Sequence, residues 1–266
     1  KETRPTIIHA HDMKASFYVA LVCGKIPFVS HIHNNNVDSR RMSLKSILYY
    51  YAARKAKYIF WVSKAAYQGY AFHNKFKKKS SILYNVIDVN EIYEKVSQDK
   101  KDYFYDIVYV GRLTYQKNPQ RLGEVLSGVS KRLPSMKAAV VGTGDLEAEI
   151  KQKIHENHLE NCIDMLGYIS NPYKIMKNAK VLIMTSRWEG LPMCALEAMA
   201  LGVPIVSTPT DGLKELVENG KTGFLSDDNE ILIARCCEIL ENSSLYEKLH
   251  EGTLKKANLI LKTQSY

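Results

Sequence analysis

The alternation of short apolar runs with helical patterns is the feature that most constrains this chain. Runs such as DIVYVG (106–111), KAAVVG (137–142) and KVLIMTS (180–186) are rich in aliphatic residues, and a stretch with helical periodicity follows each of them. Apolar runs of this length are typical of parallel strands buried on both faces, and the helices between them supply the crossover connections. We therefore predict an α/β protein built on parallel sheets.

The same alternation divides the sequence into two parts. In the first part we expect strands at 6–11, 27–33, 58–63 and 81–85 and helices near 13–23, 43–56 and 64–74. In the second part we expect further strands at 163–168, 204–208 and 223–227 and helices near 118–132, 145–157, 171–178, 192–201, 211–218, 229–241 and 244–260. The second part makes a complete doubly wound domain, whereas the first part lacks an opening strand and glycine-rich turn, so we expect it to be incomplete.

The polar segment 96–104 lacks periodicity and is interpreted as a linker. We accordingly predict a partial first domain (1–98), a second domain (99–245) and a C-terminal helix (246–266). No apolar run approaches the length of a membrane-spanning helix, and the first residues do not resemble a signal peptide. Five scattered cysteines without C-x-x-C spacing indicate reduced thiols, and we expect a cytoplasmic protein.

The chain is basic, with 37 Lys and Arg against 28 Asp and Glu and a net charge of +9. Such a surface favours anionic partners. The densest run, NKFKKKS, contains Lys75 to Lys79. It fits either a solvated loop or helix end, or a patch that contacts an anionic membrane.

Two glutamates eight positions apart lie in SRWEGLPMCALEAMALGVPIVST (186–208). Glu189 follows the strand 180–186, at the sheet edge where doubly wound folds bind ligands. Pro192 suits the first helical position, and the amides after it form a site for an anion or sugar hydroxyls. Glu197, further along the helix, can accept hydrogen bonds from a vicinal diol such as a ribose. The alternative is a helix-start charge followed by a solvated helix residue.

Three other strand-end loops carry groups that suit a ligand. VGRLTYQKNP supplies Arg112 and Lys117, two cations able to hold a diphosphate and stabilise a leaving nucleoside diphosphate. VVGTGD contains Gly142 and Gly144 in a tight turn that permits close approach by a nucleotide. LGYISN (166–171) supplies Tyr168 and the exposed backbone beside it.

These motifs, together with ENGKTGFL, resemble the donor-binding domain of glycosyltransferase family 4 (glycosyl transferases group 1), which are retaining enzymes of the GT-B fold. IIHAHD, PFVSHIHN, WVSKAAYQGY and ILYNVID resemble parts of that family's acceptor-side domain. The resemblance implies two Rossmann-like doubly wound domains, the first one incomplete. The family's lysine-glycine pair is replaced here by Lys117-Asn118, a mild change at a helix start.

The resemblance also implies the role of each site residue. Arg112 and Lys117 would contact the donor diphosphate, Glu189 the hydroxyls of the transferred sugar, and Glu197 the ribose. The remaining contacts would come from the backbone of Gly190, Leu191, Pro192 and Met193, the base-pocket residues Gly142, Gly144, Tyr168 and Ile169, and His33 near the acceptor.

The expected reaction is retaining transfer of a hexose-type sugar from a nucleotide diphosphate sugar, with UDP favoured, to an acceptor hydroxyl. We expect a front-face displacement without a cofactor or metal, because the two cations replace one. A lipid-linked saccharide in exopolysaccharide or capsule assembly is the expected acceptor, and the enzyme would be cytoplasmic and peripheral at the inner face of the membrane.

Three alternative interpretations of the sequence remain open. The pairs His9/His11 and His31/His33 could form a metal site. Their placement on separate strands argues against it. A nucleotide-sugar epimerase of the same fold is a second alternative. The third is a non-catalytic module that binds nucleotide sugars or an anionic membrane. Nucleic acid is not an expected partner, because RNA-binding aromatic platforms are missing.

Overall fold

The computed structural model describes residues 5–34 and 37–262, and the chain divides into two compact units. The first unit comprises Lys1–Asn85 and Trp188–Leu191, and the second comprises Val86–Arg187 and Pro192–Tyr266. The segment with Glu189 therefore groups with the first unit. The residues 86–98 and those from 246 group with the second unit, whereas the sequence analysis gave them to the first domain and to a separate helix. The last four residues of that predicted helix, 263–266, lie outside the described residues.

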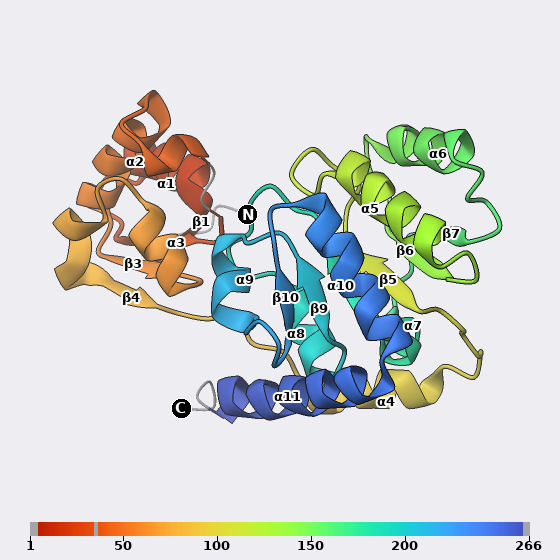
Figure 1. Ribbon diagram of the computed structural model, residues 1–266. Coiled ribbons are helices and arrows are strands. Elements are labelled where there is room, and N and C mark those ends of the chain that lie inside the picture. The colour runs from red at the N-terminus through yellow and green to blue at the C-terminus, as the bar shows by residue number, and fades with distance from the viewer. Residues whose placement is uncertain (1–4, 35–36, 263–266) are drawn as a thin grey trace. The chain divides into compact units, whose positions relative to one another are not determined.

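The first unit contains a four-stranded parallel sheet in the order β1-β2-β3-β4 (Figure 1). Its strands are β1 (Ile8–His11), β2 (Phe28–Ile32), β3 (Tyr58–Trp61) and β4 (Ser80–Ile82). Its helices are α1 (Asp12–Val22), α2 (Leu44–Lys55) and α3 (Lys64–Gly69), with 3-10 turns η1 (Val37–Arg40) and η2 (His73–Lys79). The hydroxyls of Ser43 and Ser63 cap the N-termini of α2 and α3.

Polar side chains connect the elements inside this unit. Ser16 on α1 and Ser30 on β2 have their hydroxyl oxygens 2.7 Å apart, and Ser30 lies 2.9 Å from the hydroxyl of Tyr49 on α2. All three residues are buried, and burial raises the pKa of Tyr49. Because buried hydroxyls need partners, this chain of contacts fixes how α1 and α2 pack on β2.

The lysine-rich run lies in η2, where one of its members has a structural role. The Lys79 ammonium donates to the carbonyl oxygens of Arg54 (2.9 Å) and Ala56 (2.7 Å) at the end of α2, while Lys75, Lys77 and Lys78 are exposed. Lys79 thus supplies a donor to carbonyl oxygens that the helix leaves without one.

The second unit contains a six-stranded parallel sheet in the order β10-β9-β8-β5-β6-β7. Its strands are β5 (Ile107–Val110), β6 (Ala138–Val141), β7 (Ile163–Gly167), β8 (Val181–Met184), β9 (Ile205–Ser207) and β10 (Gly223–Leu225). Its helices are α4 (Val89–Gln98), α5 (Pro119–Arg132), α6 (Glu147–Glu156), α7 (Tyr173–Asn178), α8 (Met193–Ala200), α9 (Asp211–Leu216), α10 (Asn229–Glu241) and α11 (Ser243–Lys262).

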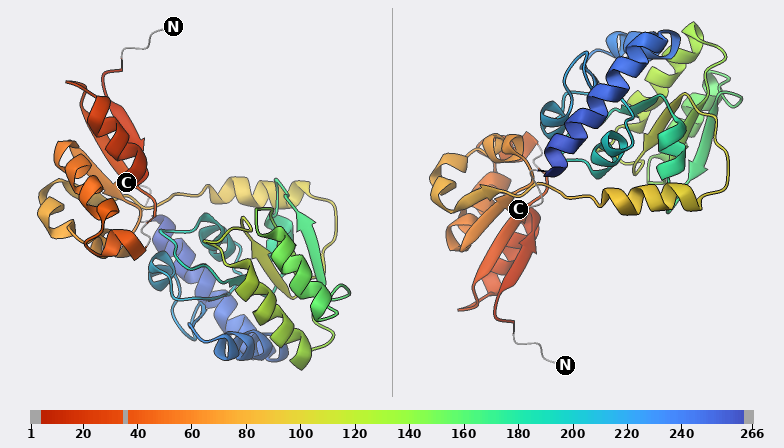
Figure 2. Two further views of the ribbon diagram at one scale, coloured as in Figure 1. Left: turned by 90° about the horizontal axis from the view of Figure 1, so that it is seen from above. Right: turned by 90° about the horizontal axis from the view of Figure 1, so that it is seen from below.

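Helices cover both faces of this second sheet (Figures 1 and 2). On one face α5 packs against α6 and α10, and on the other α4, α7 and α8 pack against one another. Every residue of β6 and of β8 is buried, as the apolar runs predicted. The α/β architecture with doubly wound parallel strands is thereby confirmed.

One helix was not predicted. Residues 96–104 were interpreted as a linker, but α4 extends to Gln98, and the Asp88 carboxylate caps its start by accepting from the Glu91 N–H (3.1 Å). In the described part of the chain, no helix combines the length and apolar character needed to cross a membrane.

Candidate functional site

The loops after β5, β6 and β7 form one continuous edge in the second unit. Backbone hydrogen bonds join them, from the N–H groups of Gly111, Leu113 and Gly142 to the oxygens of Val141 (3.0 Å), Thr143 (2.9 Å) and Gly167 (2.7 Å), respectively. Carboxyl ends of parallel strands meet at one edge, which is where doubly wound folds bind their ligands.

The two glycines of VVGTGD are required by the packing of these loops. A Cβ atom on Gly142 would lie 1.9 Å from the oxygen of Gly111, and one on Gly144 would lie 2.2 Å from the oxygen of Leu113. Gly142 also has a φ of +135°, which side-chain-bearing residues rarely adopt. The sequence analysis attributed this closeness to an approaching nucleotide. The structure adds a second reason, because backbone of the neighbouring loop lies where the Cβ atoms of these glycines would be.

A pocket of about 200 Å³ opens between these loops. Its lining consists of Val110, Gly111, Arg112, Val141, Gly142, Thr143, Tyr168 and Ile169. Four of the predicted site residues, Arg112, Gly142, Tyr168 and Ile169, are therefore brought together. Gly144, Lys117, Pro192, Met193 and Glu197 are not part of this lining.

Two cations lie on the loop after β5, and one of them, Arg112, lines this pocket. Arg112 is exposed, and its guanidinium makes no hydrogen bond or ion pair with any described residue. The Lys117 side chain passes close by, since its Cε lies 3.7 Å from where a Cβ of the lining residue Gly111 would be. A guanidinium and an ammonium carried by one loop suit a diphosphate, which offers acceptor oxygens to both.

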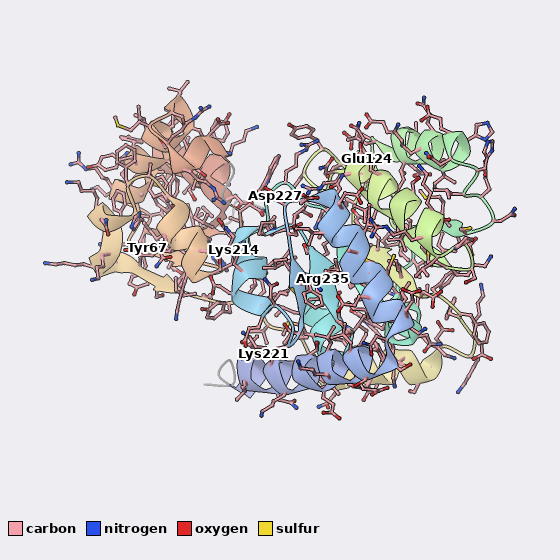
Figure 3. The ribbon with its side chains drawn as sticks, in the orientation of Figure 1. Tyr67, Glu124, Lys214, Lys221, Asp227 and Arg235 are labelled. Carbon is pink, nitrogen blue, oxygen red and sulfur yellow. The ribbon has the colours of Figure 1, made fainter. Side chains whose placement is uncertain are left out.

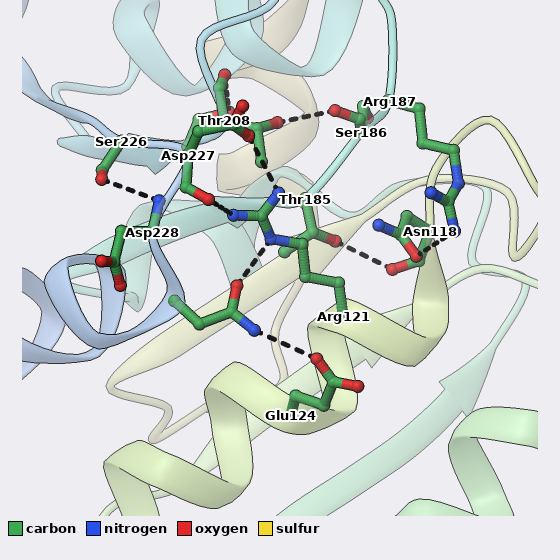
Figure 4. A network of polar contacts seen from close by, with 12 residues as sticks. Asn118, Arg121, Glu124, Thr185, Ser186, Arg187, Thr208, Ser226, Asp227 and Asp228 are labelled. Atoms are coloured by element: carbon green, nitrogen blue, oxygen red, sulfur yellow. Dashed lines mark hydrogen bonds and ion pairs between the residues drawn. The ribbon is translucent and has the colours of Figure 1, made fainter.

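The loop that carries these cations is anchored by polar contacts (Figure 4). Asn118, the N-cap of α5, has a left-handed backbone with φ +57°, a conformation that asparagine tolerates better than most residues. Its side-chain oxygen accepts from Arg187 (3.0 Å), which also donates to the Tyr115 oxygen (3.2 Å) and lies over the Tyr115 ring. Thr185 donates to the oxygens of Lys117 and Asn118, both at 3.2 Å.

A second network lies next to this loop (Figure 4). Arg121 donates to Asn229 Oδ1 (2.7 Å) and Asp227 Oδ1 (3.0 Å), and Asn229 donates to the carboxylate of Glu124 (3.0 Å). Asp227 and Glu124 lie at the same end of this unit (Figure 3). The contacts tie α5 to the start of α10, beside a pocket of about 260 Å³.

Sequence reasoning missed Arg121 and Arg187 in these networks. Arg187 directly follows the strand-end sequence MTS, so its position at the sheet edge could have been predicted from the sequence. Nothing in the sequence of α5 distinguishes Arg121 from a solvated helix residue.

Glu197 lies on α8 and faces a tyrosine of the neighbouring helix. The hydroxyl of Tyr173 on α7 donates to Glu197 Oε1 (3.3 Å). The carboxyl is half-buried, and burial raises its pKa against the lowering effects of Tyr173 and Lys95. Pro192, predicted at the first helical position, is instead the N-cap of α8, one position before the first helical residue Met193. Glu197 is therefore not the fully solvated residue of the alternative reading.

The first glutamate of the motif belongs to the first unit, together with His33. Glu189 is 5% exposed, and Gly190 packs so closely on His33 that a Cβ would lie 1.6 Å from the His33 oxygen. The side chain of Asn85 donates to the Leu191 oxygen (2.8 Å). The structure thus gathers Glu189, Gly190, Leu191 and His33 within one unit, and excludes a solvated Glu189.

His33 is also part of a histidine group. Its Nε2 lies 2.8 Å from His11 Nδ1, and its backbone N–H donates to Asp12 Oδ1 (2.9 Å). Burial lowers the pKa of His33, while the Asp12 carboxylate acts in the opposite direction. Burial, together with the neighbouring His33, His9 and His11, lowers the pKa of His31 to about 4. The two H-x-H pairs lie on separate strands, as expected, but β1 and β2 are neighbours in the sheet and so bring the pairs together.

Comparisons with known proteins show the family to which this chain belongs. The family model of the glycosyl transferases group 1 matches residues 90–256, and that of glycosyltransferase family 4 matches residues 1–91. The chain is 25% identical over 257 residues to an Escherichia coli protein named UDP-Gal:alpha-D-GlcNAc-diphosphoundecaprenol alpha-1,3-galactosyltransferase, covering 87% of this chain and 65% of that protein. It is 34% identical over 157 residues to an N-acetylgalactosamine-N,N'-diacetylbacillosaminyl-diphospho-undecaprenol 4-alpha-N-acetylgalactosaminyltransferase of Campylobacter jejuni, covering 58% and 42%.

A solved structure shows the same fold. The crystal structure of Anabaena Alr3699/HepE in complex with UDP matches with a TM-score of 0.81 at 22% identity, over 97% of this chain and 76% of that chain. The fold is α/β with two parallel-sheet domains of the GT-B type. This chain spans 56%, 23% and 65% of the length of three curated relatives that it matches. With one model matching most of its length, the chain belongs to the glycosyl transferases group 1 family.

Proposed function

We propose that this chain carries the donor-binding machinery of a retaining glycosyltransferase that uses a UDP-linked hexose-type sugar. The observation that carries the proposal is the Arg112 guanidinium, which has no partner among the described residues and lines a pocket at the sheet edge. An exposed cation held beside an apolar recess suits a ligand with a planar group and a negatively charged tail.

The size of the pocket indicates which part of the donor it takes. Its volume of about 200 Å³ lies below the roughly 300–1,000 Å³ of pockets that enclose whole drug-sized ligands. It therefore suits the base, with Tyr168 (78% exposed) available to stack on it. The pyrophosphate would extend towards Arg112 and Lys117.

The proposed mechanism is a front-face displacement. Arg112 and Lys117 stabilise the charge that develops on the departing diphosphate, without a resident metal. An oxygen of that phosphate takes the acceptor proton, Glu189 orients the sugar, and Glu197 holds the ribose. His33 lies near the acceptor, and the backbone from Gly190 to Met193 contributes amides to sugar and phosphate.

The acceptor is proposed to be a lipid-linked saccharide in exopolysaccharide or capsule biosynthesis. Support comes from the names of the Escherichia coli and Campylobacter jejuni relatives, which contain a diphospho-undecaprenol acceptor, and the first of them also names UDP-Gal. A net charge of +9 suits a protein that works in the cytoplasm, at the inner face of an anionic membrane.

Calorimetric titration with UDP tests the role of Arg112. Loss of a charge-assisted hydrogen bond costs about 2 kcal/mol, so Arg112→Ala should weaken UDP binding roughly 30-fold. The matched control is Arg132→Ala, which also removes one arginine charge. Arg132 is the last residue of α5 and pairs with Glu230 on the surface. Equal affinities of the wild type and Arg112→Ala would remove Arg112 from the donor site.

A further inference from the structure

The first unit contains a group of histidines on one face of its sheet. Strands β1 and β2 pair in parallel with His11 opposite His31. Side chains alternate along a strand, so His9 shares the face of His11, and His33 shares that of His31. The ring centroids of His9 and His31 lie 5.5 Å apart, and those of His11 and His31 lie 5.6 Å apart.

His31 is the member that a structural role does not explain. It is 8% exposed, and neither ring nitrogen has a hydrogen-bond partner among the described residues. An imidazole always carries a donor or an acceptor at each ring nitrogen, and leaving both buried without a partner is costly. The rings next to it are those of other histidines and of Phe60. None of them forms a hydrogen bond with His31 in the part of the chain that the structure describes.

We propose that His9, His11 and His31 together bind a divalent transition-metal ion of the zinc type. Each ring offers one nitrogen, and the three nitrogens lie within 4.8 Å of one another. Zinc–nitrogen bonds of about 2.0–2.1 Å in a tetrahedron place ligand nitrogens about 3.3 Å apart. The rings must therefore close in by small side-chain rotations, which the exposed His9 and His11 can make.

The surroundings suit a cation of this class. Three imidazoles are ligands for zinc, copper or nickel rather than for magnesium or calcium, which prefer oxygen. His33 contacts His11 Nδ1 and so restrains the ring of one ligand, as outer partners of metal-binding histidines do. The Asp12 carboxylate, which accepts from the His33 N–H, adds negative charge beside the group.

The three histidines belong to the first unit, whereas the residues that line the donor pocket belong to the second unit. Metal binding can be measured without nucleotide or acceptor, so its test is independent of the proposed function. The proposal makes no step of sugar transfer depend on the metal.

Titration of the untagged, chelator-treated chain with Zn²⁺ alone tests the proposal. We expect one Zn²⁺ per chain with a Kd of about 1 µM or tighter, because neutral imidazoles on neighbouring strands already lie close together and need only small rotations to bind the ion. His9→Ala should weaken binding by at least about tenfold, since one of three ligands is lost. His9 is exposed, so this variant keeps the fold, and His31→Ala should give a larger loss.

The matched control is His155→Ala in the second unit, where His155 pairs on the surface with Glu160. It should bind Zn²⁺ like the wild type. Substitution with Co²⁺ adds a spectroscopic measurement, because a tetrahedral site gives intense visible absorption bands that His9→Ala should remove. Binding weaker than about 100 µM, which corresponds to adventitious surface contacts, would overturn the proposal. So would an affinity that is unchanged in His9→Ala, or lost in His155→Ala.

Discussion

The two parallel sheets of this chain differ in what determines the shape of their edges. In the second unit, every residue of β6 and β8 is buried, and backbone hydrogen bonds join the loops after β5, β6 and β7. In the first unit, hydroxyl contacts connect α1, β2 and α2, and four histidines share one face of the sheet.

This difference has a physical consequence. Apolar burial is non-directional, so it does not by itself fix the loops at the edge of the second sheet. Close packing of their backbones can fix them instead. Hydrogen bonds between side chains are directional, so the first unit depends on particular polar partners. The comparison predicts that the two units fail for different kinds of substitution.

The largest effect is expected at a glycine of the second unit. Gly142→Ala places a Cβ 1.9 Å from a backbone oxygen at a φ of +135°, so it should destabilise the segment β5–β7 by about 3 kcal/mol or more. Hydrogen exchange of the amides in β5, β6 and β7 measures this directly. The control is Gly167→Ala, which has φ +65° but no atom within 4 Å of the new Cβ, and should cost about 1 kcal/mol. Equal losses in both variants would contradict the account of loop packing.

A smaller effect is expected from a hydroxyl of the first unit. Tyr49→Phe removes one contact of Ser30 inside the core and should cost about 1 kcal/mol, seen as faster hydrogen exchange in α2 and β2. Tyr18→Phe, at a position 56% exposed, is the control and should be neutral. If Tyr49→Phe is as stable as Tyr18→Phe, polar contacts do not determine the packing of the first unit.

The smallest effect is expected at the start of α5. Asn118→Gly relieves a left-handed backbone conformation but loses the contact with Arg187, so the two changes should nearly cancel, within about 0.5 kcal/mol. Urea unfolding followed by circular dichroism measures the net change. A loss above about 2 kcal/mol would show that the Arg187 contact dominates at this position.

The alternation of apolar runs and helical patterns predicted nearly all elements, because strands buried on both faces have an unmistakable composition. Helix α4 was missed, since its apolar residues are few and the polar residues after it suggested a linker. Its start signal, Asp88 followed three positions later by Glu91, is readable from sequence in retrospect.

Only part of the candidate pocket was predictable from the sequence, since Gly144, Lys117 and Glu197, for example, are not among its lining residues. Arg112, Tyr168 and Ile169 line the pocket as the motifs suggested, because strand-end loops of a parallel sheet converge. The space beside Gly142 depends on the neighbouring loop, which no local pattern specifies. Likewise, the contact between the two histidine pairs depends on the strand register, with His11 opposite His31.

A thermal-shift panel of nucleotide sugars tests the central claim most directly, since a ligand that binds the native state raises its melting temperature by mass action. The account predicts that UDP and UDP-linked hexoses raise the melting temperature of the chain, and that Arg112→Ala reduces the shift. Melting temperatures that stay unchanged with every nucleoside diphosphate and every nucleotide sugar would contradict the claim that the edge of the second sheet is a donor site.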